Sequence, residues 1–139
     1  MASEHTAKAF DTDLQELTRL VAEMGGQVER MITESVDALV RRDVALGNRV
    51  VATDVEIDRL QHLIEERAVL TIARRQPMAV DLREIVSALR IAHDLERIGD
   101  LAKNIAKRAI PLSSARQMKM TTSIVRMGRE TLTQLSNVL

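Results

Sequence analysis

Near its centre the sequence reads Leu46-Gly-Asn-Arg-Val-Val-Ala-Thr-Asp-Val-Glu-Ile-Asp-Arg-Leu-Gln-His-Leu-Ile64. Its apolar side chains return every three or four residues, at Leu46, Val50, Ile57, Leu60 and Ile64. This spacing places them on one face of an α-helix, and we predict a helix over residues 44–74. Asp43 is the expected N-cap, because its short carboxylate can accept a hydrogen bond from an otherwise unpaired backbone N–H.

The same spacing predicts a long helix on each side of this one. The upstream helix spans residues 13–42, is capped by Asp11 or Asp13, and has the stripe Leu14, Leu17, Val21, Met24, Val28, Met31, Ser35 and Ala38. The downstream helix spans residues 79–110 and has the stripe Ile91, Leu95, Ile98, Ala102, Ile105 and Ala109. Pro77 separates it from the central helix and Pro111 ends it, because proline lacks a backbone N–H. Short connections favour antiparallel neighbours, so the sequence predicts an all-α fold, an antiparallel three-helix bundle.

A fourth helix is predicted from Ser114 to Leu139, with Ser114 and Gln117 forming a capping box at its start. The segment Val21–Gly25 (Val-Ala-Glu-Met-Gly) is similar to Ile124–Gly128 (Ile-Val-Arg-Met-Gly), so we interpret the fourth helix as a repeat of the first. We therefore divide the chain into a three-helix bundle over 1–111 and the first helix of an incomplete second bundle over 112–139.

Two apolar surfaces have more than one interpretation. The fourth helix cannot bury its stripe alone, so it packs on the bundle, pairs with another chain or joins a second bundle. The central helix carries a partial second stripe, which serves either packing within the bundle or contact with another subunit. That stripe consists of Val51, Val55, His62 and Val69.

The composition excludes several classes of protein. The 139 residues include 20 basic and 20 acidic side chains, one aromatic residue and no cysteine. Zero net charge and a single Phe argue against a nucleic-acid binder that uses bulk charge or base stacking. The lack of Cys excludes disulfides and thiolate zinc sites and is typical of a reducing compartment. No stretch approaches the roughly 18 apolar residues of a membrane-spanning helix.

Two pairs of carboxylates are spaced four residues apart on the predicted helices. Asp54 and Asp58 lie on the central helix beside its apolar stripe, and Glu96 and Asp100 lie on the third helix. Residues four apart share a helix face. If the two faces meet, their oxygen atoms could bind a hard or borderline metal ion: Mg, Mn, Fe or Zn.

A second interpretation of these carboxylates stays open on the pattern alone. An acidic row on a helix is commonly a solvated face, and Arg97, Lys103 and Lys107 could form ion pairs within the third helix. The sequence contains no Gly-rich phosphate loop and no His-Glu zinc motif, so no catalytic or cofactor-binding residue is predicted.

Several segments together resemble the PhoU family of phosphate-signalling regulators. Ala73-Arg-Arg-Gln-Pro-Met-Ala-Val-Asp-Leu-Arg83, followed by His93-Asp-Leu-Glu-Arg-Ile-Gly-Asp100, carries the most specific part of the resemblance. Phe10-Asp-Thr-Asp-Leu-Gln-Glu-Leu17 and Asp54-Val-Glu-Ile-Asp58 add to it. The family's fold is two three-helix bundles in tandem, which agrees with the repeat found above.

The resemblance implies a function and a site. PhoU-like proteins are non-enzymatic negative regulators of the bacterial phosphate-starvation response. They connect the ATPase subunit of the phosphate-specific ABC transporter to a sensor histidine kinase, in the cytoplasm or held at the inner face of the plasma membrane through these partners. Family members bind metal through E/D-x-x-x-D motifs, and Asp54, Asp58, Glu96 and Asp100 match those motifs.

Two other classes of protein remain as alternatives. One is a metal-independent helical oligomerisation module, and the other is a histidine-phosphotransfer-like bundle that uses His62 or His93. We also expect a homodimer, formed through the fourth helix, because exchange of one helix between chains is a low-cost route to a dimer.

Overall fold

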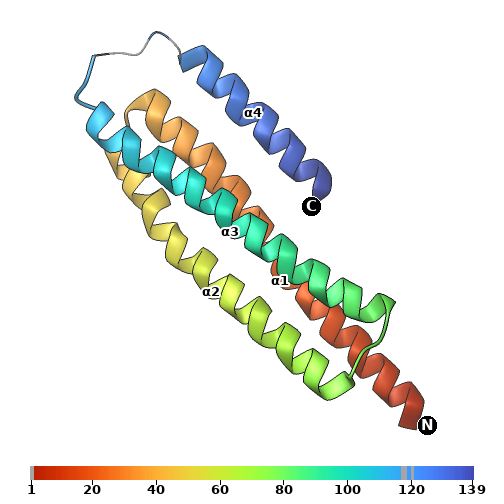
Figure 1. The fold of residues 1–139 in the computed structure, drawn as a ribbon. Helices are drawn as coiled ribbons and strands as arrows, with labels where there is room; N and C mark the ends of the chain where they lie inside the picture. Colours follow the sequence, from red (N-terminus) through yellow and green to blue (C-terminus); the bar gives the residue numbers. More distant parts are fainter. Residues whose placement is uncertain (1, 117–118, 120) are drawn as a thin grey trace.

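The computed structural model describes residues 2–116, 119 and 121–139, and these residues form four α-helices (Figure 1). The helices are α1 (Ala2–Arg41), α2 (Val44–Arg75), α3 (Val80–Leu112) and α4 (Thr121–Val138). Helices α1, α2 and α3 form the predicted antiparallel bundle, and α4 lies along one side of it (Figure 1). The all-α fold is therefore confirmed.

The interior of the bundle is built from the predicted apolar stripes. Val50, Ile57, Leu60 and Ile64 of α2 are completely buried. They pack against the buried α1 side chains, which include Leu17, Leu20, Met24, Val28 and Met31. Burial of these large side chains removes apolar surface from water, the main force that stabilises such a bundle.

Small residues allow α3 to approach both neighbours closely. A Cβ atom placed on Gly99 would lie 3.6 Å from Ile57 Cγ2 of α2 and 3.8 Å from Val28 Cγ2 of α1. One placed on Gly47 of α2 would lie 3.2 Å from the Ala106 carbonyl oxygen. The predicted α3 stripe is correct for Leu95, Ala102 and Ala109, which are buried. It is wrong for Ile91, which is 44% exposed, because Ala92 takes the inward position in that turn.

The α2 boundaries follow local chemistry. The Asp43 carboxylate accepts a hydrogen bond from the Leu46 N–H at 2.9 Å, so the predicted N-cap is confirmed. At the other end, Gln76 adopts a left-handed conformation (φ 46°) and its N–H donates to the Ile72 carbonyl. Pro77 follows directly and prevents the helix from continuing.

The predicted start of α1 is wrong. The helix begins at Ala2, so Asp11 and Asp13 lie inside it rather than at its N-cap. Most described side chains of residues 4–9 are exposed, so this first part of α1 carries no apolar stripe by which to recognise it. Asp13 instead accepts a hydrogen bond from Arg75 Nε of α2 at 3.0 Å.

Two predictions about the connection between α3 and α4 are also corrected. Pro111 lies inside the last turn of α3, which ends at Leu112. Pro111 removes only its own N–H from this last turn, and the Ser113 N–H still donates to the carbonyls of Ala109 and Ile110. Ser114 does not cap the fourth helix: its hydroxyl donates to the Pro111 carbonyl, and α4 begins only at Thr121. Gln117 of the predicted capping box lies outside the described residues.

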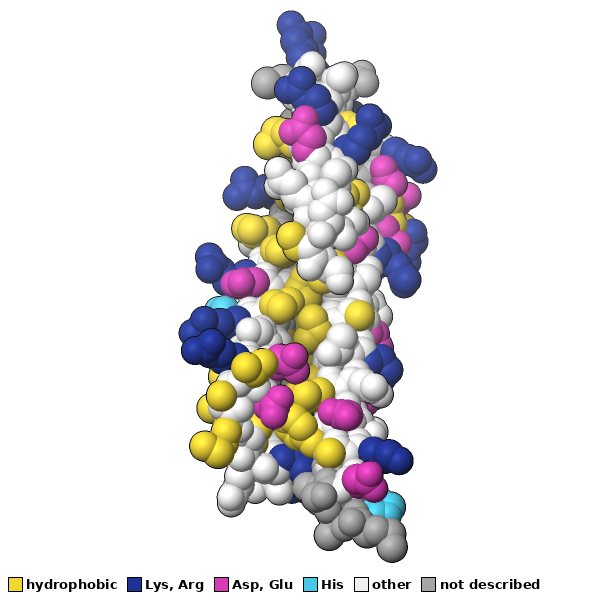
Figure 2. All heavy atoms as spheres, turned by 90° about the vertical axis from the view of Figure 1, so that its right-hand side faces the viewer, with side chains coloured by type: hydrophobic (Ala, Val, Ile, Leu, Met, Phe, Trp, Pro, Cys, Tyr) yellow, Lys and Arg dark blue, Asp and Glu magenta, His cyan; other side chains and the backbone are white. Residues whose placement is uncertain are grey.

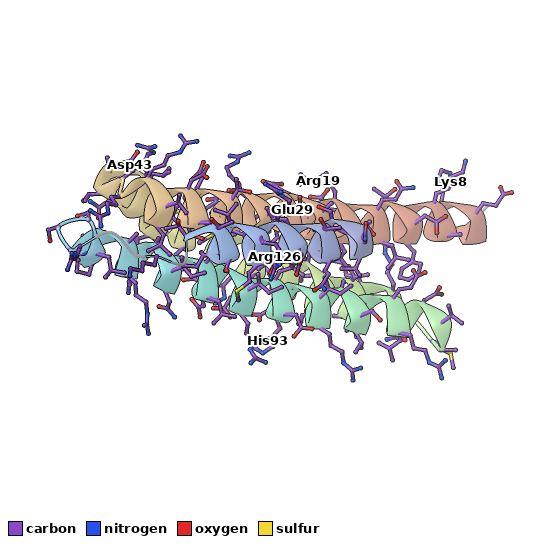
Figure 3. The ribbon with its side chains drawn as sticks, turned by 90° about the horizontal axis from the view of Figure 1, so that it is seen from above. Lys8, Arg19, Glu29, Asp43, His93 and Arg126 are labelled. Carbon is purple, nitrogen blue, oxygen red and sulfur yellow. The ribbon has the colours of Figure 1, made fainter. Side chains whose placement is uncertain are left out.

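Helix α4 packs against α1 and runs antiparallel to it. A Cβ atom on Gly25 would lie 2.8 Å from the Leu139 side chain, and one on Gly128 would lie 2.9 Å from Val36 Cγ2. The offset that relates Gly25 to Gly128 also relates Val36 to Leu139. The two similar segments therefore make equivalent close contacts. Ser136 donates a hydrogen bond across this contact to Glu29, which lies beside α4 in Figure 3.

Within the described part of the chain, none of the helices combines the length and apolar character needed to cross a membrane.

Candidate functional site

The structure brings the two predicted carboxylate pairs to one side of the α2–α3 contact. We call Asp54, Asp58, Glu96, Asp100 and Lys103 the acidic flank. Lys103 Nζ of α3 lies 2.6 Å from Asp54 Oδ2 of α2 and 3.1 Å from Asp100 Oδ1 of α3. The side chains of Lys103 and Asp54 are only 21% and 17% exposed. A single ammonium group thus joins carboxylates from both helices.

The packing of the bundle explains why these groups meet. Ile57 and Gly99 fix the register of α2 against α3, because the absence of a Gly99 side chain lets Ile57 lie against the α3 backbone. Asp54 lies about one turn from Ile57, and Asp100 follows Gly99 directly. Both carboxylates therefore emerge beside the same apolar contact.

Glu96 and Asp58 belong to the same electrostatic neighbourhood. Burial raises the pKa of Glu96 above its ordinary value, and the nearby Asp100 and Asp58 carboxylates raise it further. The opposite holds for Asp100, because its hydrogen bond with Lys103 lowers the pKa of that carboxyl group. Asp54 in turn raises the pKa of Lys103. The acidic flank therefore contains carboxylates that repel one another, and its ammonium group contacts two of them, Asp54 and Asp100.

The donor chemistry of the acidic flank suits a hard cation, and the Lys103 ammonium shows that a positive charge fits between Asp54 and Asp100. With the side chains as they lie, however, no three His, Asp or Glu side chains of the described residues converge in a geometry that could hold a metal ion. Metal binding would need Lys103 to leave and the carboxylates to turn toward one point. The four ligand assignments therefore stay a prediction.

From the sequence, Lys103 was expected to form ion pairs only within its own helix. The pair with Asp100, three residues away, is the intrahelical ion pair that the spacing allowed. The contact with Asp54 depends on the register between α2 and α3, and the pattern of one helix contains no information on that register. The position of Lys103 in the sequence therefore could not predict its contact with Asp54.

The two histidines of the phosphotransfer alternative lie apart on the surface. The His62 side chain is 81% exposed, and its Nδ1 lies 3.7 Å from the Glu65 carboxylate of the same helix. His93 points away from the bundle (Figure 3). Val55 and Val69 of the partial second stripe are also exposed, by 73% and 62%, whereas Val51 is partly buried against the core. Packing inside the bundle therefore accounts for Val51 but not for the rest of the stripe.

A second surface feature lies between α1 and α3, beyond the end of α4. This groove has a volume of about 480 Å³ and is lined mainly by apolar side chains, among them Leu14, Val21, Val80, Ile91 and Leu139. Figure 2 faces this side of the molecule, and hydrophobic side chains run down the middle of its lower half.

The described residues thus form a long antiparallel helical bundle with an acidic flank and an apolar groove on its surface. Comparison with known proteins then gives the family. The PhoU domain family matches residues 21–109, which is more than half of the chain. The chain therefore belongs to the PhoU family, as the sequence predicted.

Relatives and a solved structure support this assignment. The chain is 46% identical to a "Phosphate-specific transport system accessory protein PhoU homolog" of Rhizobium meliloti (strain 1021), over 100% of this chain and 59% of the relative. It is 48% identical to the homolog of Caulobacter vibrioides (strain NA1000 / CB15N), over 99% of this chain and 60% of the relative. A crystal structure of PhoU from Pseudomonas aeruginosa superposes with a TM-score of 0.87 at 34% identity, covering 91% of this chain and 61% of that one. The chain thus spans about three fifths of the length of these proteins.

Proposed function

We propose that this chain acts as a negative regulator of the bacterial phosphate-starvation response and does so by binding partners, without catalysing a reaction. The observation that carries the proposal is the 46% identity, over the whole chain, to a protein named as an accessory protein of the phosphate-specific transport system. An accessory protein of a transporter acts through contact surfaces, and long rigid helices provide such surfaces. Family membership, rather than the fold, supports the proposal, because fold alone does not define function.

Two partners fit this role. The ATPase subunit of the phosphate ABC transporter is the first, and a phosphate-sensing histidine kinase is the second. The chain would join the two as an adaptor, so that the state of the transporter changes the contacts of the kinase. It would work in the cytoplasm, peripherally at the inner face of the plasma membrane, where both partners reside.

We further propose that the acidic flank binds a divalent or trivalent metal ion, with Fe, Mn, Zn and Mg as the candidates. Asp54 and Asp58 of α2 and Glu96 and Asp100 of α3 would hold it. Bound metal would supply positive charge that offsets the carboxylate repulsion. The carboxylates themselves would then fix the spacing of α2 and α3 on the face that meets a partner.

A homodimer remains part of the proposal. Helix α4 contacts α1 and neither of the other two helices, so the same contact could form between two chains. Light scattering across a range of concentrations tests this idea. A monomer at every concentration would contradict it.

The regulatory role can be tested in cells that lack their own PhoU-family regulator. A phosphatase reporter controlled by phosphate starvation should be active in such cells even when phosphate is abundant. Expression of this chain should lower the reporter, and binding to the purified ATPase subunit and to the cytoplasmic part of the kinase should be measurable. Failure to bind either partner, with the chain folded by circular dichroism, would contradict the adaptor role.

The same preparation separates the two alternatives. Stable phosphohistidine at His62 or His93 after exposure to a phosphorylated response-regulator domain would favour the phosphotransfer class. An assembled protein that cannot be loaded with metal and binds neither partner would favour the oligomerisation module.

A further inference from the structure

A second stripe runs along the first half of α3, on the outside of the bundle. We call it the outer stripe: Leu82, Val86, Leu89 and His93, which follow one another at intervals of four, three and four residues. These intervals are the a/d spacing with which one helix packs along another. Leu82 is 37% exposed, Val86 and Leu89 are half-buried, and His93 points away from the bundle (Figure 3). The described helices therefore leave a helix-packing pattern of α3 partly uncovered.

Two adjoining hollows lie along the outer stripe. The first has a volume of about 560 Å³ and is lined by Ala79, Leu82, Arg83, Val86, Ser87 and Arg90. The second has a volume of about 390 Å³ and is lined by Val86, Leu89, Arg90, His93 and Asp94. Each lining includes residues at i, i+3, i+4 and i+7, the four positions that surround an inserted side chain of a facing helix. The shape of this surface therefore suits side chains from a second helix.

Three arginines border the outer stripe. Arg83, Arg90 and Arg97 are seven residues apart, so they lie on one side of α3 at intervals of about two turns. All three are exposed, and none forms an ion pair with another described residue. Exposed Arg19 and Arg59, by contrast, are paired with glutamates of their own helices. The α3 arginines occupy the position next to a packing stripe from which charged side chains reach a partner helix.

We propose that the outer stripe binds an amphipathic helix of a partner protein, which places apolar side chains in the two hollows and carboxylates beside Arg83 and Arg90. A helix laid along a surface contacts only a narrow strip of it. An anionic membrane would also attract the arginines, but it would repel the exposed Glu84 and Asp94 on the same helix. The inference rests on the proposed adaptor role, for which it names a contact surface, and not on the proposed metal site.

The spacing of the arginines defines the chemistry of the partner helix. Guanidinium groups bind carboxylates well, so the partner should carry Asp or Glu at an interval of seven residues beside its apolar stripe. Arg97 would extend this match, but it directly follows Glu96 of the acidic flank, which would repel a further carboxylate. The binding surface therefore covers residues 79–93, about two heptads of α3.

The test uses two fluorescent helical peptides of about three heptads. Both have Leu at the a and d positions; the acidic peptide has Glu at e and g, and the basic peptide has Lys there. Binding is measured by fluorescence anisotropy to the unaltered chain, to Arg83→Glu/Arg90→Glu and to Arg30→Glu/Arg49→Glu. The last variant makes the same change of net charge at exposed positions of α1 and α2. Circular dichroism first confirms that each protein is folded.

We expect the unaltered chain and Arg30→Glu/Arg49→Glu to bind the acidic peptide equally within about twofold. Arg83→Glu/Arg90→Glu should bind it roughly tenfold more weakly, because two ion pairs at the edge of the interface are lost. The same variant should bind the basic peptide more tightly than the unaltered chain does, since its reversed charges then match. A folding defect would weaken binding but would not reverse the preference.

Several outcomes would overturn the inference. Equal binding of the acidic peptide by the unaltered chain and Arg83→Glu/Arg90→Glu would do so, as would no binding by the unaltered chain. Adsorption of the unaltered chain to phosphatidylserine vesicles without peptide binding would replace the partner helix with a lipid surface.

The adaptor role is tested separately with the purified ATPase subunit and the cytoplasmic part of the kinase. Binding to either partner that Arg83→Glu/Arg90→Glu leaves unchanged would overturn the outer stripe as the contact surface and leave the adaptor role in place. Failure of the folded, unaltered chain to bind either partner would overturn the adaptor role, whereas the peptide measurements judge the outer stripe itself.

Discussion

Ile57 and Asp54 lie about one turn apart on α2, yet they meet α3 in opposite ways. Ile57 is completely buried and packs near Gly99, in what we call the apolar seam: Ile57, Leu60, Ile64, Leu95 and Gly99. Asp54 belongs to the acidic flank and accepts a hydrogen bond from Lys103 of α3. Both regions join the same two helices. The apolar seam joins them by close packing of uncharged side chains, whereas the acidic flank joins them by a charged hydrogen bond.

The apolar seam and the acidic flank therefore contribute differently to the contact between α2 and α3. Packed apolar interiors leave little room for alternatives, so the apolar seam keeps α2 and α3 in register. The acidic flank adds a charged contact, Lys103 with Asp54, beside this packed frame. Single substitutions can separate the two contributions.

The largest effect is expected from Ile57→Ala in the apolar seam. Removing most of a fully buried side chain should lower the free energy of unfolding by about 2–5 kcal/mol, because it loses apolar burial and leaves a cavity. Urea denaturation followed by circular dichroism measures this loss. Val55→Ala is the matched control on the same helix, since Val55 is 73% exposed, and should change stability by less than about 0.5 kcal/mol. Similar losses for the two variants would contradict the assignment of the apolar seam.

A smaller effect is expected from Asp43→Ala at the start of α2. This change removes the acceptor of the 2.9 Å hydrogen bond from the Leu46 N–H and should cost about 1 kcal/mol. The same denaturation experiment applies, and Asp43→Ser should retain most of the stability because Ser also caps helices. A Ser variant as unstable as the Ala variant would mean that the cap is not the cause.

The features probed by these two substitutions also show how much of the fold the sequence predicts. The Asp43 cap and the α2 stripe were predicted correctly because both depend on neighbours within one helix. The predicted start of α1 was wrong because most described side chains of residues 4–9 are exposed and form no apolar stripe. The predicted end of α3 at Pro111 was wrong because a helix can include proline in its last turn. Ile91 was placed in the core because periodicity alone cannot say that Ala92 faces inward instead.

The acidic flank was predictable only in its parts. The spacing of Asp54 with Asp58 and of Glu96 with Asp100 showed that each pair shares a helix face. The two faces lie side by side because Ile57 packs on Gly99, and this packing also lets Lys103 join them. Such contacts between helices depend on the whole bundle, so they become visible only in the structure.

A modest effect is expected from Lys103→Met in the absence of metal. The change leaves Asp54 partly buried without its cation and should lower the free energy of unfolding by about 0.5–1 kcal/mol. Lys107→Met removes an exposed ammonium group of the same helix and should change stability by less than about 0.5 kcal/mol. Thermal unfolding of both variants in the presence of a chelator measures the two effects. Equal stability of the two variants would contradict the role of Lys103 in joining α2 to α3.

The smallest effect is expected from Glu96→Gln, and its sign is opposite. Glu96 and Asp100 are like charges four residues apart, so neutralising Glu96 should stabilise the metal-free protein by a few tenths of a kcal/mol. Glu66→Gln on the exposed face of α2 is the control and should have no such effect. Denaturation of both variants in chelator decides the point, and a destabilised Glu96→Gln would indicate that its carboxylate supports the fold.

The most direct test of the central claim is metal content by elemental mass spectrometry, after loading with Fe, Mn, Zn and Mg in turn. The unaltered chain is compared with Glu96→Ala/Asp100→Ala, and Glu65→Ala/Glu66→Ala removes the same charge from the exposed face of α2 as a control. The account predicts that the unaltered chain and the control retain metal, and that the acidic-flank variant loses it while remaining helical. Equal metal in all three proteins, or none in the unaltered chain, would contradict the assignment of the acidic flank as a metal site.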